Sequence, residues 1–381
     1  MAIGGAIALG AGRAGTIVSF DKLLREARLL FGIFDHLDDG GVPLGQLFEE
    51  RLQLIEAYDR AGFYGYHLAE HHATPLGYAP SPGVFLSAVA QRTRQLRFGP
   101  MVYLLPLYHP LRLIEEICML DQMSAGRFLL GVGRGISPIE VGFFGVDFAH
   151  GMQQYEEALA VIRLGLTHDE LTYRGEFYNF DAVPIVLKPA QLPHPPLWYG
   201  VSRPETLSWA AENDVNLVSF LRPMPAMRSL VEQFQAEWAA LGKRPDTLPC
   251  IGVTRHIVVA ETEKEARNIA ARAYRPWRRN MEVLWERRGV RFPLQGELAD
   301  EFDVLQRHGV AFAGTPAGAR DYVAAQAEGS GINYFVCDMA FGDITLDEAK
   351  RSVELFAQEV MPALAMPDQV LKGRNHALWD L

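Results

Sequence analysis

The sequence is short of cysteine, of positive charge and of long apolar runs, and each shortage excludes a class of protein. Only three cysteines occur in 381 residues, at Cys118, Cys250 and Cys337. This odd, scattered set provides neither a disulfide framework nor a zinc cluster. The formal net charge of -10 disfavours nucleic acid and anionic membrane as partners, because both attract basic surfaces. No apolar run approaches the about 20 residues that span a bilayer, so we expect a cytoplasmic protein with a small, neutral or apolar ligand.

The first residues lack the basic segment and long apolar segment of a secretory signal. They do contain a pattern typical of dinucleotide binding, since Gly10, Gly12 and Gly15 match G-x-G-x-x-G and Asp35 follows at the usual spacing. However, the glycines are followed by TIVSF, which is β-branched and aromatic where that motif requires a helix. We therefore expect residues 1–27 to be a flexible extension and residues 367–381 to be a C-terminal tail.

Between these ends, short apolar runs alternate with segments of helical periodicity. We expect eight strands, at 29–35, 64–70, 96–105, 127–133, 196–201, 215–220, 251–260 and 332–338. The expected helices are 46–61, 83–93, 111–123, 205–212, 226–241, one from 263 and one at 346–360. Eight strand-helix units favour a single (β/α)8 barrel domain, although periodicity alone leaves an open doubly wound sheet as the alternative.

Two stretches are longer than simple connections. Residues 171–196 have the pattern of a small hairpin followed by a proline-rich return. Residues 275–313 are weakly patterned, and long insertions at the functional end of a barrel often cover the site. We expect 275–313 to act as a lid.

Chemistry in a barrel sits at the carboxyl ends of the strands, and the second expected strand ends in Glu70, His71 and His72. A zinc site is disfavoured, because His67 and His71 on one strand would point the same way but about 13 Å apart. An acid or base role for one histidine fits better, since its pKa lies near neutrality. A histidine held by a local hydrogen bond remains the plainer alternative.

The next strand ends suggest an anion site. Arg134 lies among glycines after the fourth strand, and a guanidinium can bind a phosphate through two parallel hydrogen bonds. After the fifth strand, Ser202 is a possible N-cap with Arg203 and Thr206 beside it, and free amides at a helix start bind anions. We expect one phosphate between these ends, against the alternative of an ordinary capped helix.

Three longer motifs carry a resemblance to a known family. They are HLAEHHATPLGYAPSP, FGPMVYLLPLYHPLRLIEEICMLDQMSAGRFLLGVGRG and GTPAGARDYVAAQAEGSGINYFVCDMAF. With these motifs the chain resembles the bacterial luciferase-like flavin-dependent monooxygenases, most closely the alkanal-monooxygenase branch, over residues 28–366. The resemblance implies a (β/α)8 TIM barrel with insertions and a homodimer.

The resemblance also implies a cofactor and its contacts. The cofactor would be reduced FMN, supplied by a separate NAD(P)H:flavin reductase, and O2 would oxidise a small apolar substrate such as an aldehyde. A cis peptide between Met101 and Val102 would lie against the isoalloxazine ring. The residues matching the family's other flavin contacts are Arg134, which holds the phosphate, and Gly135, Ile136, Val201, Ser202, Arg203 and Thr206.

The family's catalytic histidine corresponds to His71, with Glu70 and His72 as supporting residues. Oxygen adds at C4a of the reduced flavin in this family, and a histidine beside the resulting peroxide can hold or relay its proton. The apolar surroundings would come from pocket-facing residues such as Phe34, His36, Tyr103 and Phe220. We therefore test His71 first.

Two departures argue against light emission. Gly133 stands where luciferases carry a reactive cysteine, and the 275–313 stretch lacks the lysines of their mobile lid. Two rival functions stay open, namely a deazaflavin-dependent hydride-transfer enzyme of the same superfamily and a flavin-binding protein without turnover. The sequence does not name the substrate.

Overall fold

The computed structural model describes residues 29–293 and 299–365, and the N-terminal glycine motif, the 1–27 extension and the 367–381 tail lie outside that range. Its main sheet is parallel, and each of the expected strands is found in it. These strands are β1 (Leu30–Asp35), β2 (Gly65–Leu68), β3 (Arg97–Pro100), β4 (Tyr103–Leu104), β5 (Leu130–Gly133), β8 (Leu197–Gly200), β9 (Asn216–Ser219), β10 (Ile251–Val259) and β12 (Tyr334–Asp338).

The strand order shows that the sheet curls into a barrel. It runs β3-β2-β1-β12-β10-β9-β8-β5-β4. Because β3 and β4 are two parts of the third expected strand, interrupted at Met101 and Val102, the order returns to the segment from which it began. A further bridge joins Phe98 to Phe128, just before β5. The barrel prediction is confirmed, and the open-sheet alternative is excluded.

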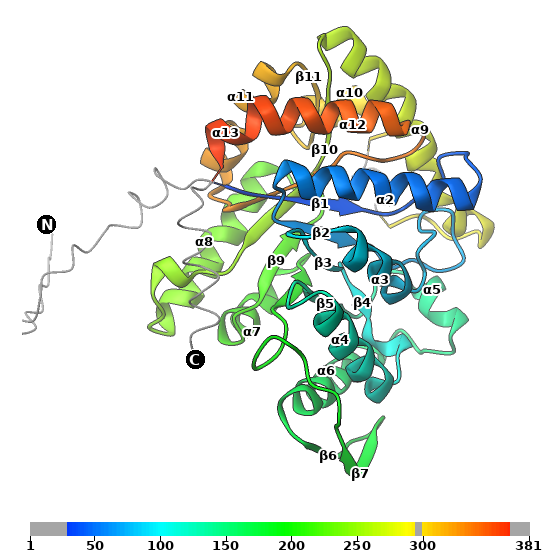
Figure 1. Cartoon of the computed structure of the whole chain (residues 1–381), viewed down its shortest axis with the longest axis vertical. Helices are drawn as coiled ribbons and strands as arrows, with labels where there is room; N and C mark the ends of the chain where they lie inside the picture. Colours follow the sequence, from blue (N-terminus) through cyan, green and yellow to red (C-terminus); the bar gives the residue numbers. More distant parts are fainter. Residues whose placement is uncertain (1–28, 294–298, 366–381) are drawn as a thin grey trace, which may run out of the picture.

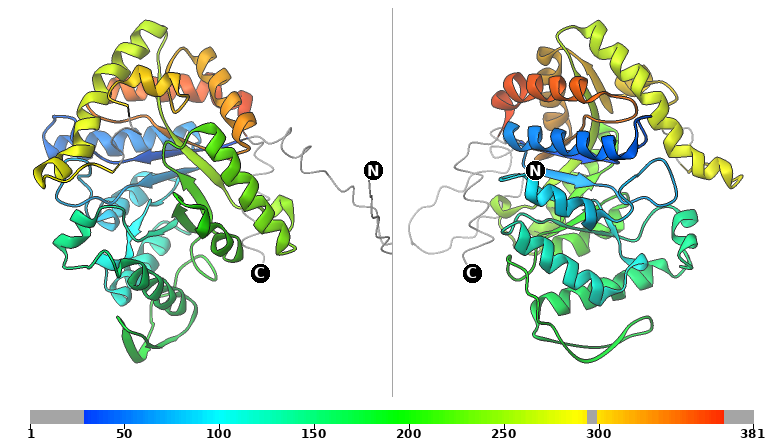
Figure 2. Two further views of the ribbon diagram at one scale, coloured as in Figure 1. Left: turned by 180° about the vertical axis from the view of Figure 1, so that it is seen from behind. Right: turned by 45° about the vertical axis from the view of Figure 1, so that its right-hand side comes forward.

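Helices surround the strands on the outside (Figures 1 and 2). The principal ones are α2 (Leu44–Ala61), α3 (Pro82–Arg92), α4 (Pro110–Met123), α6 (Gly151–Thr167), α7 (Leu207–Glu212), α8 (Met224–Ala240), α9 (Glu263–Arg287), α11 (Pro316–Ser330) and α12 (Leu346–Leu355). A π-helical turn (Phe356–Val360) and α13 (Met361–Leu364) follow α12. Helix α2 ends at Gly62, whose φ of 82° is the left-handed conformation that glycine adopts without strain.

The predicted elements were incomplete. Helices α6 and α11 were not predicted, although a helix is needed to return the chain from β5 to β8. Strand β11 (Ala311–Gly314) was also missed; it pairs with the end of β10, outside the barrel order.

The two insertions differ in character. Strands β6 (Glu170–Arg174) and β7 (Asn179–Pro184) pair antiparallel as a hairpin that projects from the barrel (Figure 2). In contrast, the first part of 275–313 is no loop, because α9 runs unbroken from Glu263 to Arg287. The short helix α10 (Phe302–Arg307) and β11 lie in the rest of this stretch, joined by irregular segments. A lid role for this stretch stays a prediction.

Strand β1 lies in the buried core of the barrel. Every residue of β1 is buried, which explains its nearly continuous apolar sequence.

Within the described ranges, no helix combines the length and the hydropathy needed to cross a membrane.

Candidate active site

Strand β2 ends at Leu68, two residues earlier than predicted, so Glu70, His71 and His72 lie in the loop that follows it. His67 stays in the strand and is fully buried, where its Nε2 is 2.8 Å from the Tyr334 hydroxyl. Burial lowers the pKa of His67 to about 3, so this imidazole is neutral. The geometry assumed for a His67–His71 pair on one strand therefore does not occur, and His67 belongs to the core.

His71 is paired with a carboxylate that the sequence reasoning missed. Its Nδ1 lies 3.3 Å from both carboxylate oxygens of Glu140. The same carboxylate accepts a 2.7 Å hydrogen bond from the backbone amide of His72. Burial alone would lower the pKa of His71, but the Glu140 charge outweighs it and the pKa is raised. His71 can therefore hold a proton near neutral pH and remains partly exposed at the strand end.

Glu140 is placed by a short helix after β5. Helix α5 (Pro138–Phe143) begins at Ser137, whose side chain accepts a hydrogen bond from the Glu140 amide. Glu140 thus occupies the first turn, where a carboxylate is favoured. The sequence did show an acidic residue, Glu140, soon after GVGRG. Periodicity could not show that this residue contacts His71.

Glu70 and His72 form a second pair beside the first. His72 Nε2 lies 2.8 Å from Glu70 Oε1, and Glu70 Oε2 accepts hydrogen bonds from the Leu104 amide at 3.2 Å and the Tyr108 hydroxyl at 2.8 Å. Burial raises the pKa of Glu70, although these partners oppose the shift. These bonds tie the loop after β2 to the segment after β4, which suits a supporting role.

The segment after β3 lies very close to the glycines of β5. The Met101–Val102 peptide is cis, as the resemblance implies. Opposite it, a Cβ at Gly131 would lie 1.9 Å from the Pro100 carbonyl oxygen, and one at Gly133 would lie 2.4 Å from Val102 Cγ2. The absence of a cysteine at 133 therefore has a steric cause in this chain.

Arg134 follows β5 and Arg203 follows β8, and these two strands are neighbours in the barrel. Arg134 and Arg203 both act electrostatically on Tyr199, whose pKa burial raises and the two guanidiniums lower. The Arg134 guanidinium also lies 4.3 Å from the centre of the Phe148 ring. Gly135 adopts a φ of 91°, and Ile136 is 70% exposed beside it. Cations that follow two neighbouring strands of a barrel are suitably placed for a phosphate.

The helix start after β8 differs from the prediction. A 3-10 turn (Pro204–Thr206) precedes α7, and no side chain caps either. Ser202 is therefore not an N-cap; its carbonyl accepts a 2.6 Å hydrogen bond from Arg222. The Thr206 hydroxyl donates to the Arg203 carbonyl at 3.0 Å, and Val201 is buried. The N-cap interpretation of Ser202 is therefore wrong, while the flavin contacts expected of Val201, Ser202, Arg203 and Thr206 stay predictions.

Of the four pocket-facing residues expected, the structure gathers Phe34, His36 and Phe220. Tyr103 lies elsewhere, because its hydroxyl donates to Glu116 on α4 at 2.7 Å and its ring is fully buried. Trp277 of α9 takes a place beside this group, 5.8 Å from the His36 ring. The sequence placed Trp277 in the expected lid stretch and did not indicate that its ring meets the barrel.

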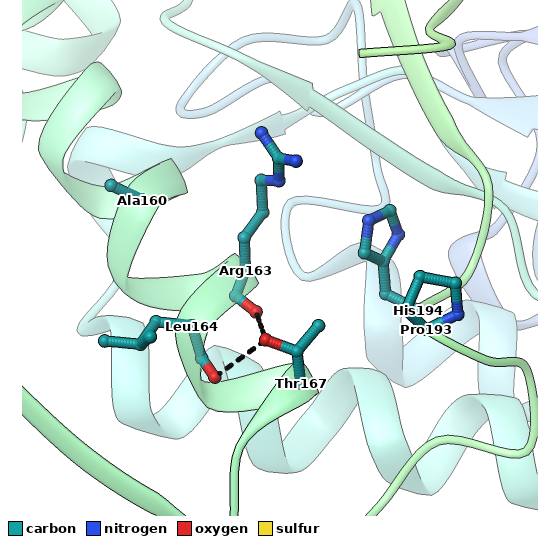
Figure 3. Close-up of a pocket in the computed structure, with 6 residues that line it drawn as sticks. All are labelled: Ala160, Arg163, Leu164, Thr167, Pro193 and His194. Carbon is teal, nitrogen blue, oxygen red and sulfur yellow. Dashed lines mark hydrogen bonds between the residues drawn. The ribbon is translucent and has the colours of Figure 1, made fainter.

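A surface pocket lies away from these residues (Figure 3). It is lined by Ala160, Arg163, Leu164 and Thr167 of α6 together with Pro193 and His194. Pro193 and His194 precede β8, and the lining part of α6 is its C-terminal half, so the pocket is at the amino ends of the strands. In barrels that end serves stability rather than chemistry.

Comparisons with known proteins identify relatives of this chain. The chain is 42% identical over 335 residues to the uncharacterized protein y4wF of Sinorhizobium fredii, covering 88% of this chain and 97% of that protein. It is 26% identical over 352 residues to the oxygenase component of the flavin-dependent trigonelline monooxygenase of Acinetobacter baylyi, covering 88% and 95%.

A solved structure has the same fold. It is the oxygenating constituent of 3,6-diketocamphane monooxygenase from Pseudomonas putida in complex with FMN, with a TM-score of 0.73, 21% identity, and coverage of 89% of this chain and 99% of that one. The sequence model of the luciferase-like monooxygenases matches residues 29–334. The chain belongs to the luciferase-like monooxygenase family.

Proposed function

We propose that this protein is the oxygenase of a two-component system, which uses reduced FMN and O2 to oxidise a small apolar substrate such as an aldehyde. The observation that carries the proposal is the His71–Glu140 pair, held at the carboxyl end of the barrel, the end at which Arg134 and Arg203 follow β5 and β8. A proton-carrying histidine and an anion site are what such a reaction requires of the protein.

The residues present fit FMN. Arg134 and Arg203 would form a cationic site for its phosphate, while the glycines of β5 let that strand approach the Met101–Val102 segment closely. Bound reduced FMN would supply the two electrons that activate O2. An aldehyde, O2 and reduced FMN would then give a carboxylic acid, oxidised FMN and water.

The chain's own residues have separate tasks in this proposal. Arg134 and Arg203 orient the cofactor through its phosphate. His71 exchanges a proton through Nε2, because Glu140 holds Nδ1. Glu70 and His72 hold the loop that carries His71. Phe34, Phe220 and Trp277 offer apolar contacts and help to exclude water.

The proposal extends to partners. The reduced flavin would come from a separate NAD(P)H:flavin reductase, as the name of the Acinetobacter relative, an oxygenase component, suggests. We also propose a homodimer, which size-exclusion chromatography with light scattering would test.

Oxygen uptake tests the proposal directly. Purified protein is mixed with an FMN reductase, NAD(P)H and a panel of aldehydes and ketones, and both oxygen consumption and oxidised product are measured. Product that depends on O2 and on reduced FMN supports the proposal. Hydride transfer to a deazaflavin without oxygen would support the rival enzyme, and FMN binding without product would indicate a flavin-binding protein.

A further inference from the structure

His36 directly follows β1 and is surrounded by an aromatic ring of β1 and by rings from two other parts of the chain. Its ring centre lies 4.8 Å from that of Phe34, and 5.8 Å from each of Phe220 and Trp277. These four residues, which we call the aromatic cluster, come from β1 and its end, the end of β9 and the middle of α9. His36 is only 5% exposed.

The tautomer of His36 is fixed by Trp277. The indole Nε1–H of Trp277 donates to His36 Nδ1 at 3.4 Å, and Trp277 is fully buried. If Nδ1 carried a proton, two donors would face each other and the buried indole N–H would have no acceptor among the described residues. The hydrogen of neutral His36 is therefore on Nε2.

That Nε2–H has no hydrogen-bond partner among residues 29–293 and 299–365. Nε2 is also absent from the fully buried unpaired atoms of these residues, so a small molecule can reach it although the His36 ring as a whole is almost buried. An accessible donor without a protein partner, held in a fixed ring beside reactive groups, is available to an acceptor atom of a ligand. The ring of His71 lies 5.7 Å away and is nearly parallel, with 27° between the planes. The free donor is thus close to the histidine proposed to exchange protons.

The two stacked histidines have opposite electrostatic environments. Glu140 raises the pKa of His71, whereas burial, followed by the nearby His71, His256 and Arg51, lowers the pKa of His36 well below its usual range. Because the environments of His71 and His36 move their pKa values in opposite directions, the two histidines are suited to different roles. His71 changes its charge, and His36 stays a neutral donor.

We propose that His36 is a substrate-binding residue that donates its Nε2–H to a carbonyl oxygen, while Phe34, Phe220 and Trp277 contact the apolar body of the same substrate. This inference rests on the proposed function and names how the site selects its substrate. A hydrocarbon of the same shape would cover this N–H without offering it an acceptor, so the site discriminates by hydrogen bonding and not only by size.

The first test measures the tautomer and needs no substrate. Protein labelled with 15N-histidine is titrated by NMR, and the His36 signals are assigned by their loss in His36→Phe. We expect neutral His36 with the proton on Nε2 across the pH range in which His71 titrates. In Trp277→Phe, which retains an aromatic ring but lacks the donor, the two tautomers should mix. A proton on Nδ1, or a charged His36 at neutral pH, would overturn the inference.

The second test measures binding of a matched pair, decanal and decane, to the protein loaded with oxidised FMN, followed by flavin absorbance. His36→Phe keeps an aromatic ring and removes the donor, so decanal should bind about tenfold more weakly while decane is little changed. The control, Phe220→Leu, should weaken both ligands alike because it removes apolar contact only.

Failure of the inference and of the proposed function give different results. Equal losses for decanal and decane in His36→Phe, or a wild-type protein without preference for decanal, would overturn the role of His36. Preferential binding of decanal without oxygen-dependent product would leave the role of His36 standing and contradict the proposed function.

Discussion

The imidazole of His71 and the carboxylate of Glu140, which are 69 residues apart in the chain, form an ion pair in which Nδ1 lies 3.3 Å from each oxygen. This pair joins the loop after β2 to the first turn of α5 and leaves Nε2 of His71 for proton exchange. Most of the chemistry proposed for the site depends on it.

Replacing His71 by Asn should lower turnover about 100- to 10,000-fold, the usual contribution of a general acid or base. FMN binding should be little changed, because the phosphate contacts lie after β5 and β8. Steady-state kinetics and flavin titration measure the two effects. His72→Asn is the matched control and should lose less, since His72 acts through Glu70. Full activity in His71→Asn would refute the catalytic assignment.

Glu140→Gln should lower the pKa of His71, because the charge that raises it is removed. NMR titration of the His71 ring would show the shift, and the acidic limb of the kcat/KM profile should move to lower pH.

The stability change in Glu140→Gln should depend on pH in a defined direction. A histidine whose pKa is raised by folding stabilises the protein fully below its unfolded pKa of about 6.5, and this contribution is lost as pH rises through the folded pKa. Urea unfolding should thus show a larger loss at pH 6 than at pH 9. In a His71→Gln background this pH dependence should vanish; its persistence would mean that another group is responsible.

Arg134→Ala should weaken FMN binding by about 1.5–3 kcal/mol, the range for hydrogen bonds to charged groups. Riboflavin lacks the phosphate and serves as the control ligand, so its dissociation constant should stay the same. Arg203→Ala should have a smaller effect, because Arg203 is exposed and more screened. Equal weakening of FMN and riboflavin would show that Arg134 does not bind the phosphate.

Arg51→Met should destabilise the fold by about 3–5 kcal/mol, since it leaves the Asp35 carboxylate buried without its cation. Arg51 Nη1 lies 3.2 Å from Asp35 and donates to the Ala340 carbonyl at 2.8 Å, with both side chains almost fully buried. The control is Arg60→Met, which removes an exposed 4.0 Å pair with Glu56 and should cost less than about 1 kcal/mol. Urea denaturation measures both, and equal losses would contradict the argument.

The sequence by itself determined the alternation of strands and helices, while closure of the sheet into a barrel was decided by the tertiary structure. Continuous apolar runs marked the buried parallel strands, and helical periodicity with its terminal glycine marked α2, because these patterns arise from each segment's own repeat. The strand ends then pointed to His71 and Arg134, since the carboxyl ends of barrel strands face one side. Tertiary structure decided what the patterns leave open, such as the direction of Tyr103 toward α4 and the loss of Ser202 as a cap.

Only the folded chain shows which charges and rings meet. Glu140 reaches His71 from a different strand-helix unit, and Trp277 reaches His36 across 241 residues of sequence. No local repeat encodes such contacts, because they depend on how whole elements pack around the barrel. The sequence therefore located His36 and His71 at strand ends, and packing determined the protonation of these two side chains.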